Sequence, residues 1–113
     1  MGVVSKCTDK YQNCINECNR CYQACRECVT LCLREDDVAE RDELIITLME
    51  CAEVCQVASR LMTMEAKHSK EICELCANVC NECAFLCSMF KDDHCIQCSE
   101  ECKKCAKECK AIA

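Results

Sequence analysis

Cysteines recur along this chain at gaps that alternate between three and four residues. Sixteen of the nineteen cysteines fall into three such runs. The runs are Cys14, Cys18, Cys21, Cys25, Cys28 and Cys32; Cys73, Cys76, Cys80, Cys83 and Cys87; and Cys95, Cys98, Cys102, Cys105 and Cys109. Because an α-helix turns once in about 3.6 residues, this alternation places every thiol of a run on one helical face. The pattern predicts helices whose inward stripe is sulfur where Leu or Ile would be usual.

The rest of the composition favours an all-α fold. The chain has no Pro and a single Gly, Gly2, so nothing inside it breaks a helix, and Asn-Gly turn signals are absent. Its 113 residues, of which 51% are hydrophobic, suit one cysteine-rich domain spanning residues 1–113.

Four helices joined by short links are expected, and short links make successive helices antiparallel neighbours. The expected ranges are Ser5–Arg34, Asp37 or Arg41–Met64, Ser69–Phe90 and Asp93–Ala111. Asp92 and Asp93 are expected as N-caps of the last helix. The predicted architecture is an antiparallel up-down-up-down four-helix bundle with a cysteine-lined core.

This topology sorts side chains to the two ends of the bundle. One end would collect Cys32, Leu44, Cys87, Met89, His94 and Cys95, and the other would collect Cys7, Met62, Met64, His68, Cys73 and Cys109. The second helix mixes Cys51 and Cys55 with an apolar pad of Leu44, Ile45 and Leu48. Since a reduced cysteine packs as a small hydrophobe, the core can form without metal. Tyr11 stands where the first inward series would have a cysteine, and it is expected to fill the core near the termini.

A secreted disulfide scaffold is the first alternative for so many cysteines. Residues 1–12 contain no apolar run like a signal peptide, and no stretch reaches transmembrane length, so we expect a cytoplasmic protein with no membrane partner. Thiols one turn apart have Cβ atoms about 5–6 Å from each other, whereas a disulfide needs about 3.5–4.5 Å. The cysteine count is also odd. We therefore expect free thiols.

Charge and motifs exclude several function classes. The formal net charge of −6 comes from 20 acidic and 14 basic residues interleaved between the cysteines, as on solvated helix faces, and this argues against nucleic acid. Phosphate-binding loops and histidine metalloenzyme spacings are absent, and no cysteine stands out as a low-pKa nucleophile. We do not expect an enzyme.

Soft thiolates select Cu(I), Zn(II) and iron–sulfur clusters. Each thiol must lose its proton to bind metal, and uncompensated charge inside a bundle is very costly. One Cu(I) per thiolate cancels that charge, whereas a divalent ion among four thiolates leaves two negative charges. Multiple Cu(I) ions are therefore the expected cargo. Zinc or cadmium sequestration stays open as an alternative, and so does an iron–sulfur electron carrier, whose ligands usually lie in loops.

Two stretches carry a resemblance to a known family. The segment Lys70–Cys83 and the later series His94, Cys95, Cys98, Cys102, Cys105 and Cys109 resemble the cytosolic bacterial copper storage proteins. The resemblance covers nearly the whole chain. It implies a four-helix bundle filled with many Cu(I) ions, a homotetramer, a cytosolic location and a storage role with copper ions as the partner. Relatives often carry several histidines at the mouth of the bundle, and here only His94 lies at the matching place.

The predicted metal ligands are all nineteen cysteines together with His94. They are Cys7, Cys14, Cys18, Cys21, Cys25, Cys28, Cys32, Cys51, Cys55, Cys73, Cys76, Cys80, Cys83, Cys87, Cys95, Cys98, Cys102, Cys105, Cys109 and His94. An exposed turn residue is the alternative reading of His94. Met62, Met64 and Met89 are either soft ligands or gap-filling side chains, and His68 is expected to be a residue of the link.

Overall fold

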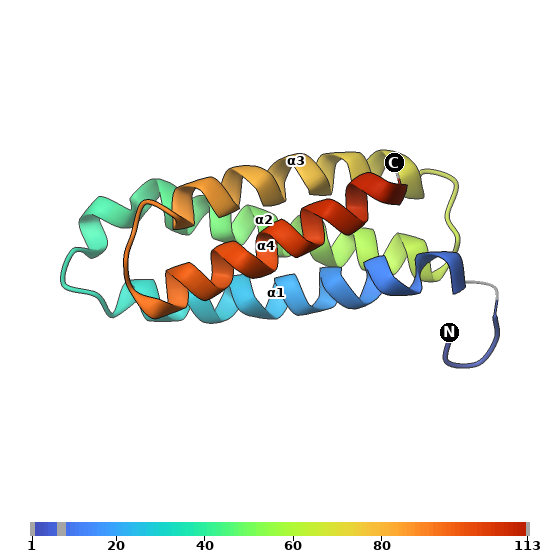
Figure 1. The fold of residues 1–113 in the computed structure, drawn as a ribbon, viewed down its shortest axis with the longest axis horizontal. Coiled ribbons are helices and arrows are strands. Elements are labelled where there is room, and N and C mark those ends of the chain that lie inside the picture. The colour runs from blue at the N-terminus through green and yellow to red at the C-terminus, as the bar shows by residue number, and fades with distance from the viewer. Residues whose placement is uncertain (1, 7–8, 113) are drawn as a thin grey trace.

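Four long helices run alternately up and down in the computed structural model, which describes residues 2–6 and 9–112 (Figure 1). The elements are η1 (Asp9–Tyr11), α1 (Gln12–Leu33), η2 (Val38–Arg41), α2 (Asp42–Thr63), α3 (Ser69–Cys87) and α4 (Asp93–Ile112). Helix α1 packs against α2 and α4, and α3 packs against the same two helices. The predicted all-α antiparallel bundle is confirmed.

Two of the expected helix boundaries are wrong. The first helix was expected from Ser5, but Ser5 and Lys6 are not helical, and a 3₁₀ turn precedes α1. The backbone N–H of Gly2 donates to a carboxylate oxygen of Asp9 at 2.9 Å, so the chain folds back on itself there. The third helix was expected to reach Phe90 but ends at Cys87. Its last carbonyls are satisfied by i→i+3 bonds, as from Phe90 N–H to Cys87 C=O at 3.1 Å, which tighten the chain into a turn.

The link after α2 is a Schellman motif without glycine. Glu65 has a φ of 49°, in the left-handed region. Its N–H donates to the Met62 carbonyl at 3.0 Å, and the Ala66 N–H donates to the Leu61 carbonyl at 2.9 Å. These two bonds satisfy the last carbonyls of α2, which offsets a left-handed residue costing about 1–2 kcal/mol. The chain thereby turns sharply into α3.

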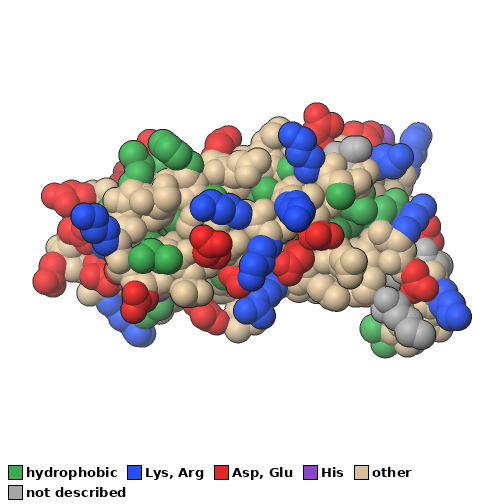
Figure 2. Space-filling view, viewed as in Figure 1, with side chains coloured by type: hydrophobic (Ala, Val, Ile, Leu, Met, Phe, Trp, Pro, Cys, Tyr) green, Lys and Arg blue, Asp and Glu red, His purple; other side chains and the backbone are tan. Residues whose placement is uncertain are grey.

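The core is sulfur along most of the bundle and aliphatic on part of α2. Leu44 and Leu48 of the expected apolar pad are buried, and Ile45 is partly buried and packs against the core. Tyr11 is buried at the end that holds the termini, as expected. Figure 2 shows acidic and basic side chains intermixed over the visible face, which is the solvated exterior that the interleaved charges predict. Within the described residues, no helix combines the length and apolar character needed to cross a bilayer.

Candidate metal centre

Every one of the eighteen described cysteines is buried, and none is in a disulfide. Thiols from all four helices meet in one continuous column, with neighbouring Sγ atoms between 3.4 and 4.0 Å apart. A disulfide bond measures about 2.05 Å. The disulfide scaffold is therefore excluded for this part of the chain. Cys7 lies outside the described residues.

In the middle of the column, the sulfur atoms form overlapping groups that lie within 4.8 Å of one another. The groups are Cys21, Cys25, Cys51 and Cys102; Cys21, Cys55, Cys80 and Cys105; and Cys18, Cys76, Cys105 and Cys109. Cys21 and Cys105 each belong to two groups, so a metal-loaded column would share thiolates between neighbouring ions. Two sulfurs about 3.6–4.0 Å apart can bracket an ion with bonds of about 2.3 Å, the length of a zinc–sulfur bond.

At one end of the column, His94 joins the thiols of Cys28, Cys32 and Cys95. Its Nε2 atom lies 3.7 Å from Cys32 Sγ and 2.7 Å from a carboxylate oxygen of Asp92. Cys32 Sγ lies 3.9 Å from the sulfurs of Cys28 and Cys95. The prediction that Cys32, His94 and Cys95 lie together at one end of the bundle is confirmed. The side chain of His94 is half-buried, so the alternative of an exposed turn residue is wrong.

Arg41 is the residue of this end that sequence reasoning missed. Its side chain is only 5% exposed, and Nη1 lies 3.5 Å from the sulfurs of both Cys32 and Cys95. The guanidinium donates to Asp37 at 2.7 Å and to both carboxylate oxygens of Asp92 at 2.8 and 3.2 Å. Phe90 packs its ring under the guanidinium at 4.4 Å. No motif marked Arg41, because Asp92 lies 51 positions away in the chain.

Asp92 and Asp93 differ in what they do at the start of α4. Asp92 takes the N-cap position, and its carbonyl accepts the N–H of Ile96 at 3.1 Å. Its carboxylate is bound by Arg41 and His94. Asp93 lies inside the first turn of the helix, so its expected role as an N-cap is wrong. There its negative charge interacts favourably with the positive end of the helix dipole.

The opposite end of the column carries thioether sulfur in place of imidazole. Cys14, Cys73 and Cys109 group there, and Cys73 Sγ lies 3.5 Å from Met62 Sδ. Met62 is fully buried, whereas Met64 and Met89 are exposed. His68 is exposed and pairs with Glu71 at 2.8 Å, as a residue of the link would. Of the three methionines considered, Met62 is the one placed beside thiols.

Hydrogen bonds between neighbouring thiols raise the pKa of some cysteines in the metal-free column and lower that of others, such as Cys21 and Cys51, while burial opposes the loss of a proton throughout. Hydrogen bonding with Cys105 and Cys109, together with burial, raises the pKa of Cys18 far above that of an ordinary thiol. Burial is also the main cause of the raised pKa of Cys32, although the hydrogen bond from Arg41 opposes it. The Arg41 guanidinium holds the pKa of Asp92 well below its usual range. A metal that binds thiols such as Cys18 and Cys32 must therefore displace their protons.

The fold and the buried thiols define a class: cysteine-rich four-helix bundles with an interior suited to soft metal ions. The chain belongs to the copper storage protein family, whose model matches residues 7–113. A Bacillus subtilis (strain 168) relative, "Uncharacterized cysteine-rich protein YhjQ", is 37% identical over 87 residues, which are 77% of this chain and 81% of that protein.

Solved structures agree with this assignment. The Cu(I)-bound copper storage protein BsCsp3 matches with a TM-score of 0.89 and 36% identity, covering 92% of this chain and 98% of that one. The copper storage protein Ccsp from Streptomyces lividans, loaded with 10 copper equivalents, matches with a TM-score of 0.88 and 32% identity, covering 92% of this chain and 83% of that one. The resemblance read from the sequence is confirmed.

Proposed function

We propose that this protein stores Cu(I) in the cytoplasm, as many ions bound to the thiolates of its buried column. The observation that carries the proposal is the unbroken array of eighteen buried, unpaired thiols with sulfur atoms spaced for bridging. Membership of the copper storage protein family supports it. So do a related structure that contains Cu(I) and another whose protein is described as cytosolic. A store needs many equivalent buried sites, whereas a carrier that passes on one ion needs one exposed site.

Charge favours Cu(I) over divalent ions in this interior. Each bound Cu(I) replaces one thiol proton, so the column stays close to neutral as it fills. Zinc is the second candidate, because a group such as Cys21, Cys25, Cys51 and Cys102 offers the four sulfurs that tetrahedral zinc needs. Zinc in that group would leave two negative charges far from water, which is costly. Bridging thiolates relieve only part of that cost.

The proposed ligands are the nineteen cysteines and His94, on one domain spanning residues 1–113. For Cys7 the support is its place in the sequence alone. His94 is supported by its 3.7 Å distance to Cys32. The proposed role is non-catalytic, because the eighteen described thiols are buried and belong to one shared array of sulfur atoms.

We also propose that the protein assembles into a homotetramer, as the family resemblance implies. Exposed apolar side chains on α2 and α3 support an assembly, among them Ile46, Leu75 and Phe85. Sedimentation equilibrium of the reduced protein should give four times the chain mass of 12.8 kDa. A monomer at micromolar concentration would contradict this proposal and leave the storage function untouched.

An anaerobic titration tests the storage function. Reduced protein titrated with Cu(I) against a competing chelator should saturate near the thiol count of nineteen per chain. Saturation at about a quarter of that count, with zinc bound more tightly than copper, would favour zinc sequestration. Visible colour in protein purified without air would favour an iron–sulfur carrier.

A further inference from the structure

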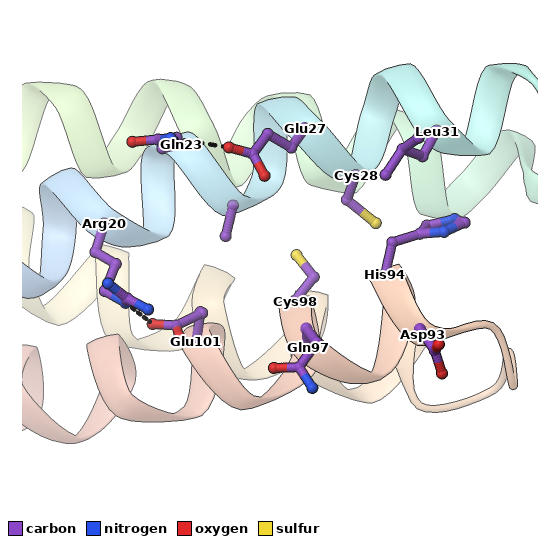
Figure 3. Close-up of a pocket in the computed structure, with 11 residues that line it drawn as sticks. Arg20, Gln23, Glu27, Cys28, Leu31, Asp93, His94, Gln97, Cys98 and Glu101 are labelled. Atoms are coloured by element: carbon purple, nitrogen blue, oxygen red, sulfur yellow. Dashed lines mark hydrogen bonds and ion pairs between the residues drawn. The ribbon is translucent and has the colours of Figure 1, made fainter.

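A groove between α1 and α4 reaches the sulfur column from the side of the bundle. It has a volume of about 410 Å³, and its lining includes the thiols of Cys28 and Cys98. Figure 3 shows Cys28 on α1 and Cys98 on α4 directed toward one another across this groove, with His94 at one side. The groove is therefore a second approach to the thiols, apart from the ends of the bundle.

The thiols at the end of the bundle are as fully covered as those under the groove. Cys32 and Cys95 are 0% exposed, although they lie in the last turn of α1 and the first turn of α4. Thiols so close to helix ends would be accessible if the end of the bundle were open. Something covers them.

Arg41 is that cover. Its guanidinium contacts the sulfurs of Cys32 and Cys95, and the paired carboxylates of Asp37 and Asp92 fix its position. Phe90 closes the other side of the guanidinium. A copper cation approaching along the bundle axis from this end meets a guanidinium in contact with the sulfurs and a ring packed against that guanidinium. Displacing the guanidinium would break its hydrogen bonds to two carboxylates.

The walls of the side groove carry an excess of carboxylates. Glu27, Asp93 and Glu101 line it, and Arg20, the cation on its wall, is paired with Glu101 at 2.8 Å. A cleft lined with an excess of carboxylates raises the local concentration of cations. The groove thus attracts a monovalent cation to thiols that Arg41 does not cover.

We propose that Cu(I) enters the column sideways through the α1–α4 groove and is first bound by Cys28 and Cys98. This inference rests on the proposed storage function and adds its route. From Cys28, the sulfurs of Cys32 and Cys95 are both 3.9 Å away. From Cys98, Cys25 is 4.0 Å away and belongs to the central groups. One port therefore feeds both the end that carries His94 and the middle of the column.

The first step is a ligand exchange without redox change. A small Cu(I) complex, such as the acetonitrile complex, loses its neutral acetonitrile ligands as two copper–sulfur bonds form. The Sγ–H bonds of Cys28 and Cys98 break, and both protons pass to the buffer. The cation and two neutral thiols thus give a two-thiolate site with one net negative charge and two released protons. Further Cu(I) ions then neutralise the remaining thiolate charge as the column fills.

The order of thiol labelling in the metal-free protein tests the port without using copper. Reduced wild-type protein is treated anaerobically with a small amount of iodoacetamide, and fragment-ion mass spectrometry locates the first modified cysteines. Among the eighteen described cysteines, Cys28 and Cys98 should react first. First reaction at Cys32 and Cys95, at Cys14, Cys73 and Cys109, or evenly along the column would overturn the proposal.

A matched pair of variants tests the port during loading. Gln97 lies exposed on the wall of the groove, so Gln97→Trp should obstruct it, whereas Asn78→Trp makes the same change on an exposed position of α3 away from it. Stopped-flow mixing with the acetonitrile complex should show Gln97→Trp loading about tenfold more slowly, the effect of about 1.4 kcal/mol of added barrier. Asn78→Trp should load at the wild-type rate, and final capacity should be equal in all three proteins.

The two outcomes of that experiment separate route from function. Equal loading rates in Gln97→Trp and Asn78→Trp at full capacity would overturn the side port and leave storage intact. A low Cu(I) capacity in the wild-type protein would contradict the storage function itself. The labelling experiment uses no copper, so its order of reaction would still show whether the groove gives access to Cys28 and Cys98.

Discussion

Arg41 is the one charged residue among the buried residues of the described chain. Four charge-assisted interactions hold it: hydrogen bonds to Asp37 and to both oxygens of Asp92, and the face of Phe90. Because water is excluded from its guanidinium, these contacts are worth more than those of an exposed ion pair. The end of the bundle depends on them.

We expect Arg41→Gln to lower the free energy of unfolding of the reduced, metal-free protein by about 2 kcal/mol, since charged hydrogen bonds are lost and two carboxylates lose their cation. Urea denaturation under anaerobic conditions, followed by far-ultraviolet circular dichroism, measures the loss. Arg20→Gln is the control, because Arg20 makes a comparable ion pair with Glu101 from an exposed position. Equal losses of unfolding free energy in the two variants would show that Arg41 stabilises the fold no more than an exposed arginine does.

Asp92 makes the stability of this end depend on acid. The hydrogen bond from Arg41 lowers the pKa of Asp92, so on acidification the unfolded chain takes up this proton before the folded protein does. The stabilisation is complete above the unfolded pKa of about 3.9 and is lost as pH falls through the lower folded pKa. Wild-type protein should therefore lose more unfolding free energy on acidification than Asp92→Asn. Parallel pH curves for the two proteins would contradict this.

At the scale of the helix, α2 divides its inward face between proposed metal ligands and structural packing. Its stripe carries Cys51 and Cys55 beside the fully buried Leu48, whereas the inward stripes of the other three helices are built mainly of cysteine. Large aliphatic side chains bury more apolar area than thiols do. Although α2 carries only two of the proposed ligands, its aliphatic side chains are expected to contribute strongly to the unfolding free energy of the metal-free bundle.

Two variants of α2 separate these roles. Leu48→Ala should lower the unfolding free energy by about 2–5 kcal/mol and leave Cu(I) capacity unchanged, because it opens a cavity without removing a ligand. Cys51→Ala combined with Cys55→Ala should lower the capacity by about two ions per chain, with a smaller loss of stability. Denaturation and anaerobic titration of both proteins give the comparison. A loss of capacity in Leu48→Ala that matches the double cysteine variant would contradict the division.

At the scale of the whole molecule, folding and copper loading both change the protonation of the buried thiols. Thiols such as Cys18, Cys28 and Cys102 have raised pKa values, with hydrogen bonds among neighbouring thiols as the largest cause and burial adding to it. Folding of the metal-free protein therefore keeps protons on these thiols, and copper loading removes them. The two processes respond to pH in opposite directions.

The metal-free protein should lose stability as pH rises above about 8.5, the ordinary thiol pKa. There the unfolded chain releases thiol protons that the folded protein retains, and each such thiol costs about 1.4 kcal/mol per pH unit until its folded pKa is reached. The copper-loaded protein, whose thiolates are already deprotonated, should not show this loss. Urea midpoints of both forms between pH 7 and pH 10 make the test, and a metal-free midpoint independent of pH would contradict it.

The sequence alone was enough to predict the fold class and the chemistry of the ligands, because both follow from local spacing. Gaps of three and four put Cys14 through Cys32 on one helical face whatever packs against it. Boundaries at Ser5 and Phe90 were predicted less well. They depend on contacts that local periodicity does not report, namely the fold-back from Gly2 to Asp9 and the turn that brings Phe90 under Arg41.

Tertiary structure alone decided which thiols share a group, which end is closed and which side is open. Cys21 meets Cys102 across 81 positions, and Arg41 meets Asp92 across 51. Such partners are brought together by the crossing of whole helices, and no pattern of neighbouring residues records it. Helical period is a property of a few consecutive residues, whereas the shape and charge of the bundle's openings belong to the packed chain.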